Sequence, residues 1–443
     1  MRNKIIILGM IFSNLITSCS TGQKKVPGGK LNDEQILFEY GIYYTPDSHK
    51  TKSDVIELLQ KNYPDFEIID SVPNPENVKG SQIVIKEIIN VKEEFAAPDI
   101  DFLRHCSRGL SDEQKEILQT SDFVILLDFL CIEDRLISTM KNANELITEL
   151  TINDNDIIWD SETRECFTKD FWIENRMIQD NSINVSKQIT IHLYPKNDYC
   201  RAITLGMLKF GLPDICIENL SCHSNQSVAS LINLTAQTLL DKKTIAKKGK
   251  LLIDIEALSN QELKTDLLNS LEEKAEKKAE INLKQGIWEE GDPQNRIMEI
   301  GFPKNNPQIK QDELIAKVFG SKDEVTYLSH DDELIAASEK AKEKIPELYD
   351  KFSKGLPVGT HLLIKFPFEN VAGEREWMWV EIVKWTDKEI KGLLQNDPQI
   401  VKSLKAGQEV TKNIDDMFDY ILYFPDGIQE GNETGKIISR QYE

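Results

Sequence analysis

The chain has 443 residues, of which 40% are hydrophobic and 29% are charged, and its formal net charge is −21. That length is enough for two or three domains, and the hydrophobic share is enough for packed cores. The excess of carboxylates argues against binding to nucleic acid or to an anionic membrane surface, because both carry dense negative charge. It suits a partner that is itself basic.

The first residues have the parts of a secretion signal. Arg2 and Lys4 precede the apolar run Ile5–Ile16, which is too short to span a bilayer as a helix. The following "ITSC" places an aliphatic residue and two small residues before Cys19, and it resembles a bacterial lipobox. The resemblance implies a signal peptide over residues 1–18, cleavage before Cys19 and attachment of lipid to the Cys19 thiol.

Residues 19–33 are small, polar and rich in glycine and lysine, so we expect a flexible tether. The protein is then expected to be anchored by its N-terminal lipid to a membrane of the bacterial cell envelope, with the bulk of the chain outside the cytoplasm. The box does not indicate which membrane or leaflet. The alternative is a cytosolic protein with an apolar first strand and a chance cysteine. The six remaining cysteines would meet an oxidising compartment, where fifteen pairings are open.

Residues 34–245 are expected to form an N-terminal α+β domain. Thr51-x-x-Asp54 and Ser111-x-x-Gln114 resemble capping boxes at the start of helices. The near-continuous apolar run "DFVILLDFL" indicates a fully buried strand. Cys131, directly after it, is then expected to be a buried thiol. Helices and strands mix without a strict βαβ alternation, which favours a layered α+β fold.

A smaller α+β segment is expected over residues 246–310. Lysine-rich Lys242–Lys250 and polar Lys304–Gln311 flank most of it, and both are interpreted as solvated linkers. Residues 331–443 are expected to form the last domain. An amphipathic helix there is interrupted at Pro346, and several short strands with regular turn signals follow. The pattern predicts a helix packed on a curled antiparallel sheet or a small barrel.

The last quarter of the chain also carries a family resemblance. The segments "MWVEIVKWTDKEIKGLLQNDP", "LKAGQEV" and "IDDMFDYILYFPDG" resemble, in this order, the YegJ-like bacterial domain of unknown function, DUF2314. Members of that family often have a tryptophan beside the aspartate of the last motif, whereas Asp416 is followed here by Met417 and Phe418. The resemblance implies no activity.

The candidate ligand surface lies in these motifs. It comprises Trp377, Trp379, Asn396, Asp397, Asp415 and Asp416. The two tryptophans are two positions apart and should face one side of a strand, where we expect at least one in the core; an exposed ligand platform is the alternative. Asn-Asp-Pro is typical of a turn, and we interpret Asp397 as a turn residue. Paired carboxylates could instead serve acid–base chemistry if burial separates their pKa values.

The sequence lacks the common catalytic and cofactor motifs. It has no GxSxG, phosphate-binding loop, dinucleotide fingerprint, HExxH or paired CxxC, so we expect no catalytic residues, no cofactor and no metal. We favour non-catalytic binding, or an accessory interaction with a basic protein as in an immunity-like inhibitor. The alternative is a carboxylate-dependent envelope hydrolase acting through the C-terminal domain. A concave pocket with converging Asp, His or Cys side chains would favour the enzyme.

Overall fold

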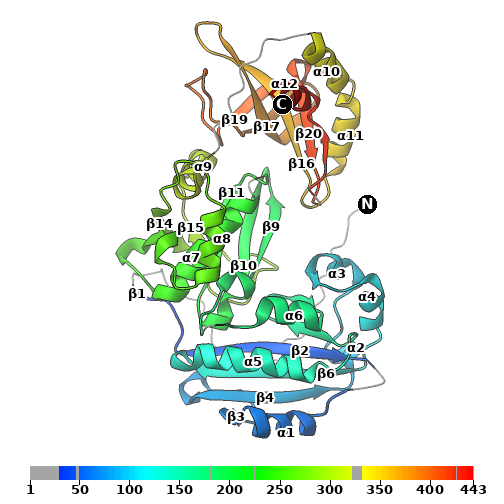
Figure 1. Cartoon of the computed structure of the whole chain (residues 1–443), viewed down its shortest axis with the longest axis vertical. Helices are drawn as coiled ribbons and strands as arrows, with labels where there is room; N and C mark the ends of the chain where they lie inside the picture. The colour runs from blue at the N-terminus through cyan, green and yellow to red at the C-terminus, as the bar shows by residue number, and fades with distance from the viewer. Residues whose placement is uncertain are drawn as a thin grey trace.

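The computed structural model describes residues 29–45, 49–179, 181–223, 225–321, 332–425 and 427–442. Its strands form three large open sheets, which follow one another along the molecule from the N-terminal to the C-terminal part, and a two-stranded ribbon (Figure 1). The fold is of the α+β class, as expected from the sequence. Cys19 lies outside the described residues, so its lipid attachment stays a prediction. Among the helices described here, none has the length and apolar character needed to cross a membrane.

The first sheet has seven strands in the order β3-β4-β6-β2-β7-β8-β5. These are β2 (Gln35–Tyr44), β3 (Phe66–Ile68), β4 (Ser81–Ile88), β5 (Ser107–Arg108), β6 (Phe123–Ile132), β7 (Ile157–Asp160) and β8 (Glu165–Phe167). The apolar run of β6 is buried, as predicted, because helices cover both faces of the sheet. Helices α1 (Lys52–Asn62) and α5 (Leu136–Leu150) pack on one face. Helices α3 (Ile100–Cys106) and α4 (Asp112–Leu118) pack on the other.

The predicted helix starts of this region are confirmed. Both capping boxes form, at Thr51 before α1 and at Ser111 before α4. Short α2 (Val91–Glu94) and α6 (Lys169–Arg176) complete the helices around the sheet. The Cys131 thiol is buried and unpaired, as expected.

The second sheet has six strands in the order β13-β14-β15-β11-β10-β9. These are β9 (Thr190–Lys196), β10 (Tyr199–Leu205), β11 (Asp214–Leu220), β13 (Lys250–Asp254), β14 (Lys278–Gln285) and β15 (Ile297–Ile300). Strand β11 pairs in parallel with β15, so strands from both sides of residue 245 belong to one sheet. The expected boundary at residue 245 therefore divides a single sheet.

Both segments interpreted as linkers are part of this second layer, and that interpretation is wrong. Helix α7 (Asn225–Lys242) leads through β12 (Thr244–Ile245) and the 3₁₀ turn Lys247–Gly249 into β13. Strand β12 pairs with β1 (Gly29–Lys30), so this part of the expected tether forms a strand. Helix α9 (Pro307–Phe319) begins inside the second expected linker and follows the short helix α8 (Gln261–Asn269) along the chain. A proline in the first turn suits a helix start, because its missing N–H has no intrahelical partner there.

The C-terminal sheet has six antiparallel strands in the order β19-β18-β17-β16-β20-β21. These are β16 (His361–Glu369), β17 (Arg375–Thr386), β18 (Glu389–Leu394), β19 (Glu409–Asn413), β20 (Asp419–Tyr423) and β21 (Gln429–Gly431). Helices α10 (Asp332–Lys342), α11 (Ile345–Lys354) and α12 (Glu433–Tyr442) accompany it. The sheet is open in the described part of the chain, so the antiparallel sheet is confirmed and the barrel alternative is wrong.

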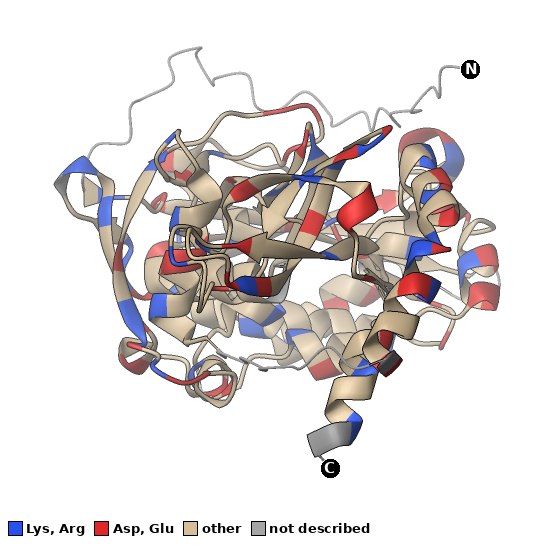
Figure 2. Cartoon of the chain, turned by 90° about the horizontal axis from the view of Figure 1, so that it is seen from above, with Lys and Arg blue, Asp and Glu red and all other residues tan. Residues whose placement is uncertain are grey.

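Lysines and arginines are interspersed with aspartates and glutamates along the helices and strands (Figure 2). On α10 and α11, lysines and carboxylates alternate at helical spacing and form ion pairs such as Lys351–Glu347 at 2.9 Å and Lys354–Asp350 at 2.6 Å. Such exposed pairs contribute little to stability, but they balance the charge of these helix faces. A carboxylate that has no cation nearby therefore differs from these paired carboxylates.

Candidate functional site: a cleft between α9 and the C-terminal sheet

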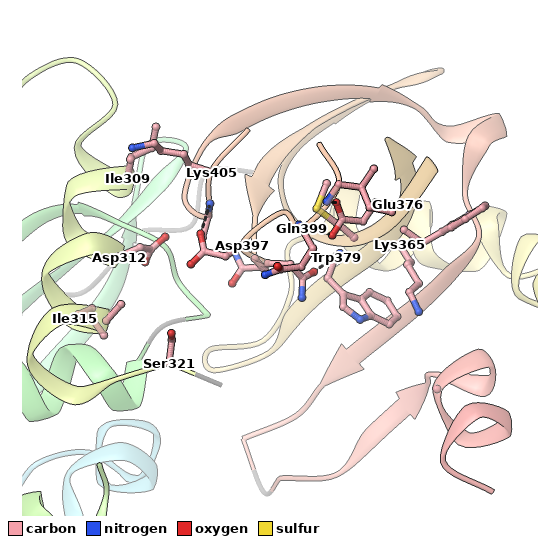
Figure 3. Close-up of a pocket in the computed structure, with 18 of the residues that line it drawn as sticks. Ile309, Asp312, Ile315, Ser321, Lys365, Glu376, Trp379, Asp397, Gln399 and Lys405 are labelled. Atoms are coloured by element: carbon pink, nitrogen blue, oxygen red, sulfur yellow. Dashed lines mark hydrogen bonds between the residues drawn. The ribbon is translucent and has the colours of Figure 1, made fainter. Parts of the chain in front are cut away.

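A cleft of about 1050 Å³ lies between α9 and the C-terminal sheet (Figure 3). Helix α9 contributes Ile309, Asp312 and Ile315 to one wall. Strand β17 contributes Trp377 and Trp379 to the other, and the loop over residues 395–406 lies beside them. The cleft thus brings together four of the six candidate residues from the sequence with a helix that begins inside the expected linker Lys304–Gln311.

The two tryptophans lie on the cleft face of β17. Their neighbours Met378 and Val380 point into the C-terminal core, so the strand alternates as expected. Trp377 and Trp379 are each half-buried and do not belong to that core. The expectation that one of them is a core residue is therefore wrong.

The core tryptophan of this strand is Trp385, which is 8% exposed. Strict alternation would put Trp385 on the same face as Trp379. A bulge between Ile382 and Lys384 shifts the register with β18 and turns the rest of the strand over. The bulge thus separates one structural tryptophan from two that border the cleft.

Aromatic and cationic groups meet at this wall of the cleft. The Lys365 ammonium, from β16, lies 5.1 Å from the centre of the Trp379 ring. Burial lowers the pKa of Lys365, and the charge of Asp419 partly opposes that effect. The Trp377 ring lies 5.8 Å from the ring of Phe418. The contact between Lys365 and Trp379 shows that the Trp379 ring already stacks against a cation.

The Asn396-Asp397-Pro398 segment is fastened to β17 by hydrogen bonds. The Asn396 side chain accepts from the backbone N–H of Trp379 at 2.7 Å, and the Gln395 N–H donates to the Trp379 carbonyl at 2.9 Å. The Glu376 carboxylate accepts from three successive backbone N–H groups, those of residues 399–401, at 2.8–3.1 Å. Asn396 thus stabilises the neighbouring strand, whereas a simple turn residue would bond to its own backbone.

Asp397 and Asp312 point toward one another from opposite sides of the cleft (Figure 3). One Asp397 oxygen accepts from the Ala406 N–H at 3.3 Å. Burial, together with the charges of Asp397 and Glu381, raises the pKa of Asp312 to about 7. Within the described residues, neither carboxylate forms an ion pair. The pair can therefore accept a cation without displacing a described partner.

A glycine allows α9 and the cleft loop to approach closely. Gly407 has a φ of +73°, and a Cβ there would lie 2.4 Å from the Asp312 carboxylate and 2.7 Å from the Gln308 backbone. Both the left-handed conformation and the lack of space require glycine. On the surface beside it, Lys405 of the loop pairs with Glu313 of α9 at 3.0 Å.

Two predicted site residues lie elsewhere. Asp415 and Asp416 belong to the short 3₁₀ turn Ile414–Asp416, are exposed and do not line the cleft. Asp415 is 3.9 Å from Lys388. The structure thus does not bring these carboxylates to Trp377 and Trp379, and placing them with the other candidates was wrong. Their position next to β20 in sequence did not reveal on which side of the sheet they lie.

Three cleft or cleft-adjacent residues were missed from the sequence. Asp312 was hidden because its helix begins in a polar Asn-Pro segment. Lys365 is a lone lysine in an apolar strand. Glu381 shares the face of Trp377 and Trp379 by simple alternation, and that spacing was a usable signal.

Residues 331–442 match the family model of an uncharacterized protein conserved in bacteria (DUF2314). The C-terminal quarter of the chain is thus similar to DUF2314, as its motifs indicated. Trp377, Trp379, Asn396 and Asp397 all lie within the DUF2314-like region, whereas Asp312 lies before it. No curated protein and no solved structure matches the chain. The cleft therefore combines the DUF2314-like region with residues that precede it.

Proposed function

We propose that the protein is a lipid-anchored, non-catalytic binding protein of the bacterial envelope, and that its cleft binds a lysine- or arginine-bearing segment of another protein. One observation carries the proposal: Asp312 and Asp397 face one another in a cleft that Trp377 and Trp379, both half-buried, also line. Support for the anchor comes from the "ITSC" box at Cys19.

The carboxylate pair favours a cationic ligand. An ammonium or guanidinium group between Asp312 and Asp397 would supply the cationic partner that neither has among the described residues. It would also relieve the repulsion that contributes to the raised pKa of Asp312. A guanidinium suits the site especially well, because its planar fork can bond two carboxylates at once.

The tryptophans favour a side chain with an apolar stem. Trp377 and Trp379 line the same cleft as the two carboxylates, and cationic side chains stack on such rings. The contact of Lys365 with Trp379 is an example within the chain itself. The net charge of −21 would in addition attract a basic partner over longer distances.

Binding of peptides tests the proposal. The probes are three short peptides of equal length that carry arginine, citrulline or glutamate at one central position. When the full chain is titrated with each peptide, only the arginine peptide should change the tryptophan fluorescence. Asp312→Asn and Asp397→Asn should each weaken that binding about tenfold or more, since each removes one charge-assisted hydrogen bond.

Asp415→Asn is the matched control, because it removes an exposed carboxylate of the same domain outside the cleft. Its affinity for the arginine peptide should equal that of the unmodified chain. Equal binding of the citrulline and arginine peptides, or an equal loss in Asp415→Asn, would overturn the proposal.

A carboxylate-dependent hydrolase is the second candidate, and one observation favours it. Asp312 has a pKa of about 7 next to a second carboxyl group, which suits a general acid near neutral pH. If the chain hydrolyses envelope material, Asp312→Asn should abolish turnover, and the arginine peptide should inhibit turnover by the unmodified chain. Turnover that survives in Asp312→Asn would remove this candidate.

A further inference from the structure

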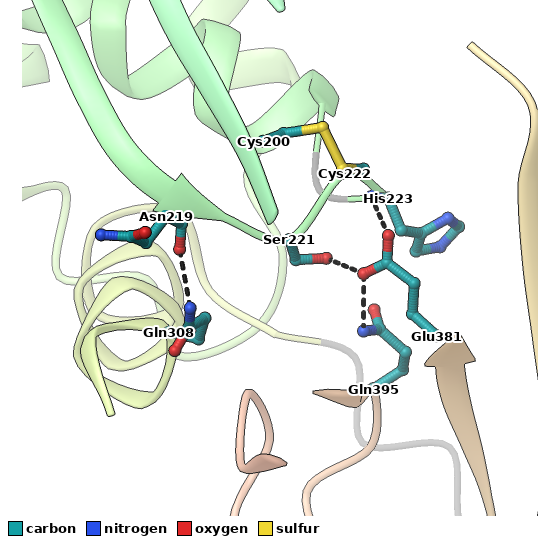
Figure 4. Close-up of a disulfide and its surroundings, with 8 residues drawn as sticks. All are labelled: Cys200, Asn219, Ser221, Cys222, His223, Gln308, Glu381 and Gln395. Atoms are coloured by element: carbon teal, nitrogen blue, oxygen red, sulfur yellow. Dashed lines mark hydrogen bonds between the residues drawn. A yellow bond between two sulfur atoms is a disulfide. The ribbon is translucent and has the colours of Figure 1, made fainter. Parts of the chain in front are cut away.

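A disulfide lies directly beneath the surface on which the C-terminal domain docks. Cys200 at the start of β10 is joined to Cys222, just after the end of β11, with their Cα atoms 5.2 Å apart (Figure 4). Cys200 and Leu220 already face each other in the β10–β11 ladder. The disulfide therefore fixes the three-residue segment Ser221–His223, where the chain leaves the sheet toward α7.

The C-terminal domain inserts a buried carboxylate against that segment. Glu381 of β17 is 3% exposed and accepts hydrogen bonds from the Ser221 hydroxyl and from the His223 backbone N–H at 2.9 Å (Figure 4). The Gln395 side chain donates to it at 3.5 Å. No cation pairs with Glu381 among the described residues. Hydrogen bonds from neutral donors of the Ser221–His223 segment therefore replace most of the water that the carboxylate loses on burial.

The other arm of the disulfide also contacts the C-terminal domain. Tyr199, immediately before Cys200, donates its hydroxyl to Glu409 of β19. On the Cys222 side, the His223 ring lies 5.0 Å from the ring of Tyr423 and 5.8 Å from that of His361. Docking contacts thus flank both half-cystines.

We infer that the C-terminal domain docks on the second sheet only when the Cys200–Cys222 disulfide is formed, so that the cleft is assembled in an oxidising compartment. The inference about docking depends only on the contacts of Glu381, Tyr199 and His223. Its consequence for ligand binding in the cleft rests on the proposed function. In a reducing compartment Cys200 and Cys222 would stay as thiols, and the cleft would stay unassembled.

Docking needs the disulfide because burying the Glu381 carboxylate without hydrogen-bond donors costs free energy. Without the disulfide, Ser221–His223 loses its covalent link to β10, and we expect its donors to lose their fixed position. A carboxylate buried without donors costs several times more than a hydrogen bond contributes, so Glu381 would return to water. The Lys405–Glu313 pair at the other end of the interface cannot replace these contacts, because it is largely exposed and such pairs are weak.

The redox step balances as a thiol–disulfide exchange. The thiols of Cys200 and Cys222 lose two protons and two electrons as their S–S bond forms. A disulfide of an oxidising protein in that compartment accepts both and becomes a dithiol. The other cysteines among the described residues, Cys106, Cys131, Cys166 and Cys216, are buried and free, so they do not compete at this surface.

Small-angle scattering and amide exchange on the full chain test the inference. The Cys200→Ser/Cys222→Ser variant should show a larger radius of gyration than the unmodified chain, with faster exchange in residues 221–223 and 376–382. Cys131→Ala is the matched control, because it removes a buried cysteine of the first sheet and should leave both measurements unchanged. Unchanged scattering and exchange in the double variant would overturn the inference.

A second variant covers the case in which the double serine variant misfolds. Glu381→Ala keeps the disulfide but leaves the Ser221 hydroxyl and the His223 N–H at the docking surface without their acceptor, so it should weaken docking and increase the radius of gyration with unchanged far-ultraviolet circular dichroism. Full docking of Glu381→Ala would contradict the role of Glu381. Reduction of the unmodified chain with a phosphine reagent should reproduce the open state, and reoxidation should reverse it.

The arginine peptide separates this inference from the proposed function. If scattering and exchange change as expected but the oxidised chain binds no arginine peptide, the proposed function fails and the docking inference stands. If the oxidised chain binds the peptide and the disulfide variant binds it equally well, the disulfide does not control the cleft.

Discussion

Glu381 accepts a hydrogen bond from the backbone N–H of His223 at 2.9 Å, although the two residues are 158 positions apart in sequence. The bond joins the DUF2314-like sheet to the loop held by the Cys200–Cys222 disulfide. On the same face of β17, four residues away from Glu381, Trp377 borders the cleft. The position of the C-terminal domain and the shape of the cleft thus depend on one strand.

The first prediction concerns the pH dependence of this contact. Burial raises the pKa of Glu381 to about 7, so the docked state favours its protonated form. Its contribution to docking is complete below the ordinary pKa near 4.5 and is lost as the pH rises through 7. Burial, with His223, lowers the pKa of His361 to about 4, so His361 acts in the opposite direction and favours docking as the pH rises from 4 toward 6.5.

Glu381→Gln should isolate the contribution of the Glu381 carboxylate to this pH dependence. A glutamine keeps the shape, accepts from the His223 N–H and does not titrate. The stability of Glu381→Gln relative to the unmodified chain should increase between pH 5 and pH 7.5, as measured by urea unfolding at each pH. A difference that stays constant over that range would show that Glu381 does not titrate with a raised pKa.

The second prediction concerns the pH dependence of ligand binding. Since Asp312 has a pKa of about 7, it is mainly protonated at pH 6 and mainly charged at pH 8. The affinity for the arginine peptide should therefore rise over this interval, and calorimetry in two buffers should detect proton release on binding. Asp312→Asn should bind weakly and equally at both values. A rise in affinity that persists in Asp312→Asn would assign the titration to another group.

The sequence predicts the local features of this molecule better than its long-range pairings. The capping boxes at Thr51 and Ser111 and the buried run of β6 depend on neighbouring residues, and all three are present. The parallel pairing of β11 with β15 is not visible in either segment, because it depends on chain reversals through α7 and α8. The expected domain boundary at residue 245 divided the sheet for that reason.

Only part of the candidate site could be predicted, because some of its residues are close in sequence and others meet through long-range packing. Trp377, Trp379, Asn396 and Asp397 lie on one strand and on the turn bonded to it, so sequence motifs located them together. Asp312 comes from α9, and its approach depends on the space left by Gly407. The bulge in β17 depends on the pairing of β17 with β18, so alternation alone could not separate Trp385 from the cleft tryptophans.

The third prediction separates the three tryptophans of β17. Trp385→Ala should lower the free energy of unfolding by about 3–5 kcal/mol, because its ring packs in the C-terminal core. Trp377→Ala and Trp379→Ala should each cost clearly less, since each ring is half-buried, yet both should weaken binding of the arginine peptide. Urea unfolding and peptide titration of the three variants provide the comparison. Equal losses of stability in all three would place the cleft tryptophans in the core after all.

The fourth prediction concerns the turn that carries Asp397. Glu376 accepts from three backbone N–H groups of residues 399–401, so Glu376→Ala should leave them without that partner and loosen the turn. A loss of about 1–3 kcal/mol in unfolding free energy is expected. Asp397→Asn keeps the acceptor for the Ala406 N–H and should cost about 1 kcal/mol or less. If Asp397→Asn destabilises the chain more than Glu376→Ala, Asp397 and not Glu376 holds the turn.

The last prediction concerns the membrane anchor. The lipobox resemblance implies that the Cys19 thiol carries lipid, and several acyl chains hold a protein on a membrane far more firmly than one does. In cells that process bacterial lipoproteins, the unmodified chain should partition into the detergent phase of a two-phase extraction, and its mature mass should include the lipid. Cys19→Ala should keep the uncleaved leader or appear in the aqueous phase. Ser18→Ala is the control, because alanine is also small and preserves the box. Detergent partitioning of Cys19→Ala after cleavage of the leader would contradict lipid attachment at Cys19, while leaving the cleft and its docking surface untouched.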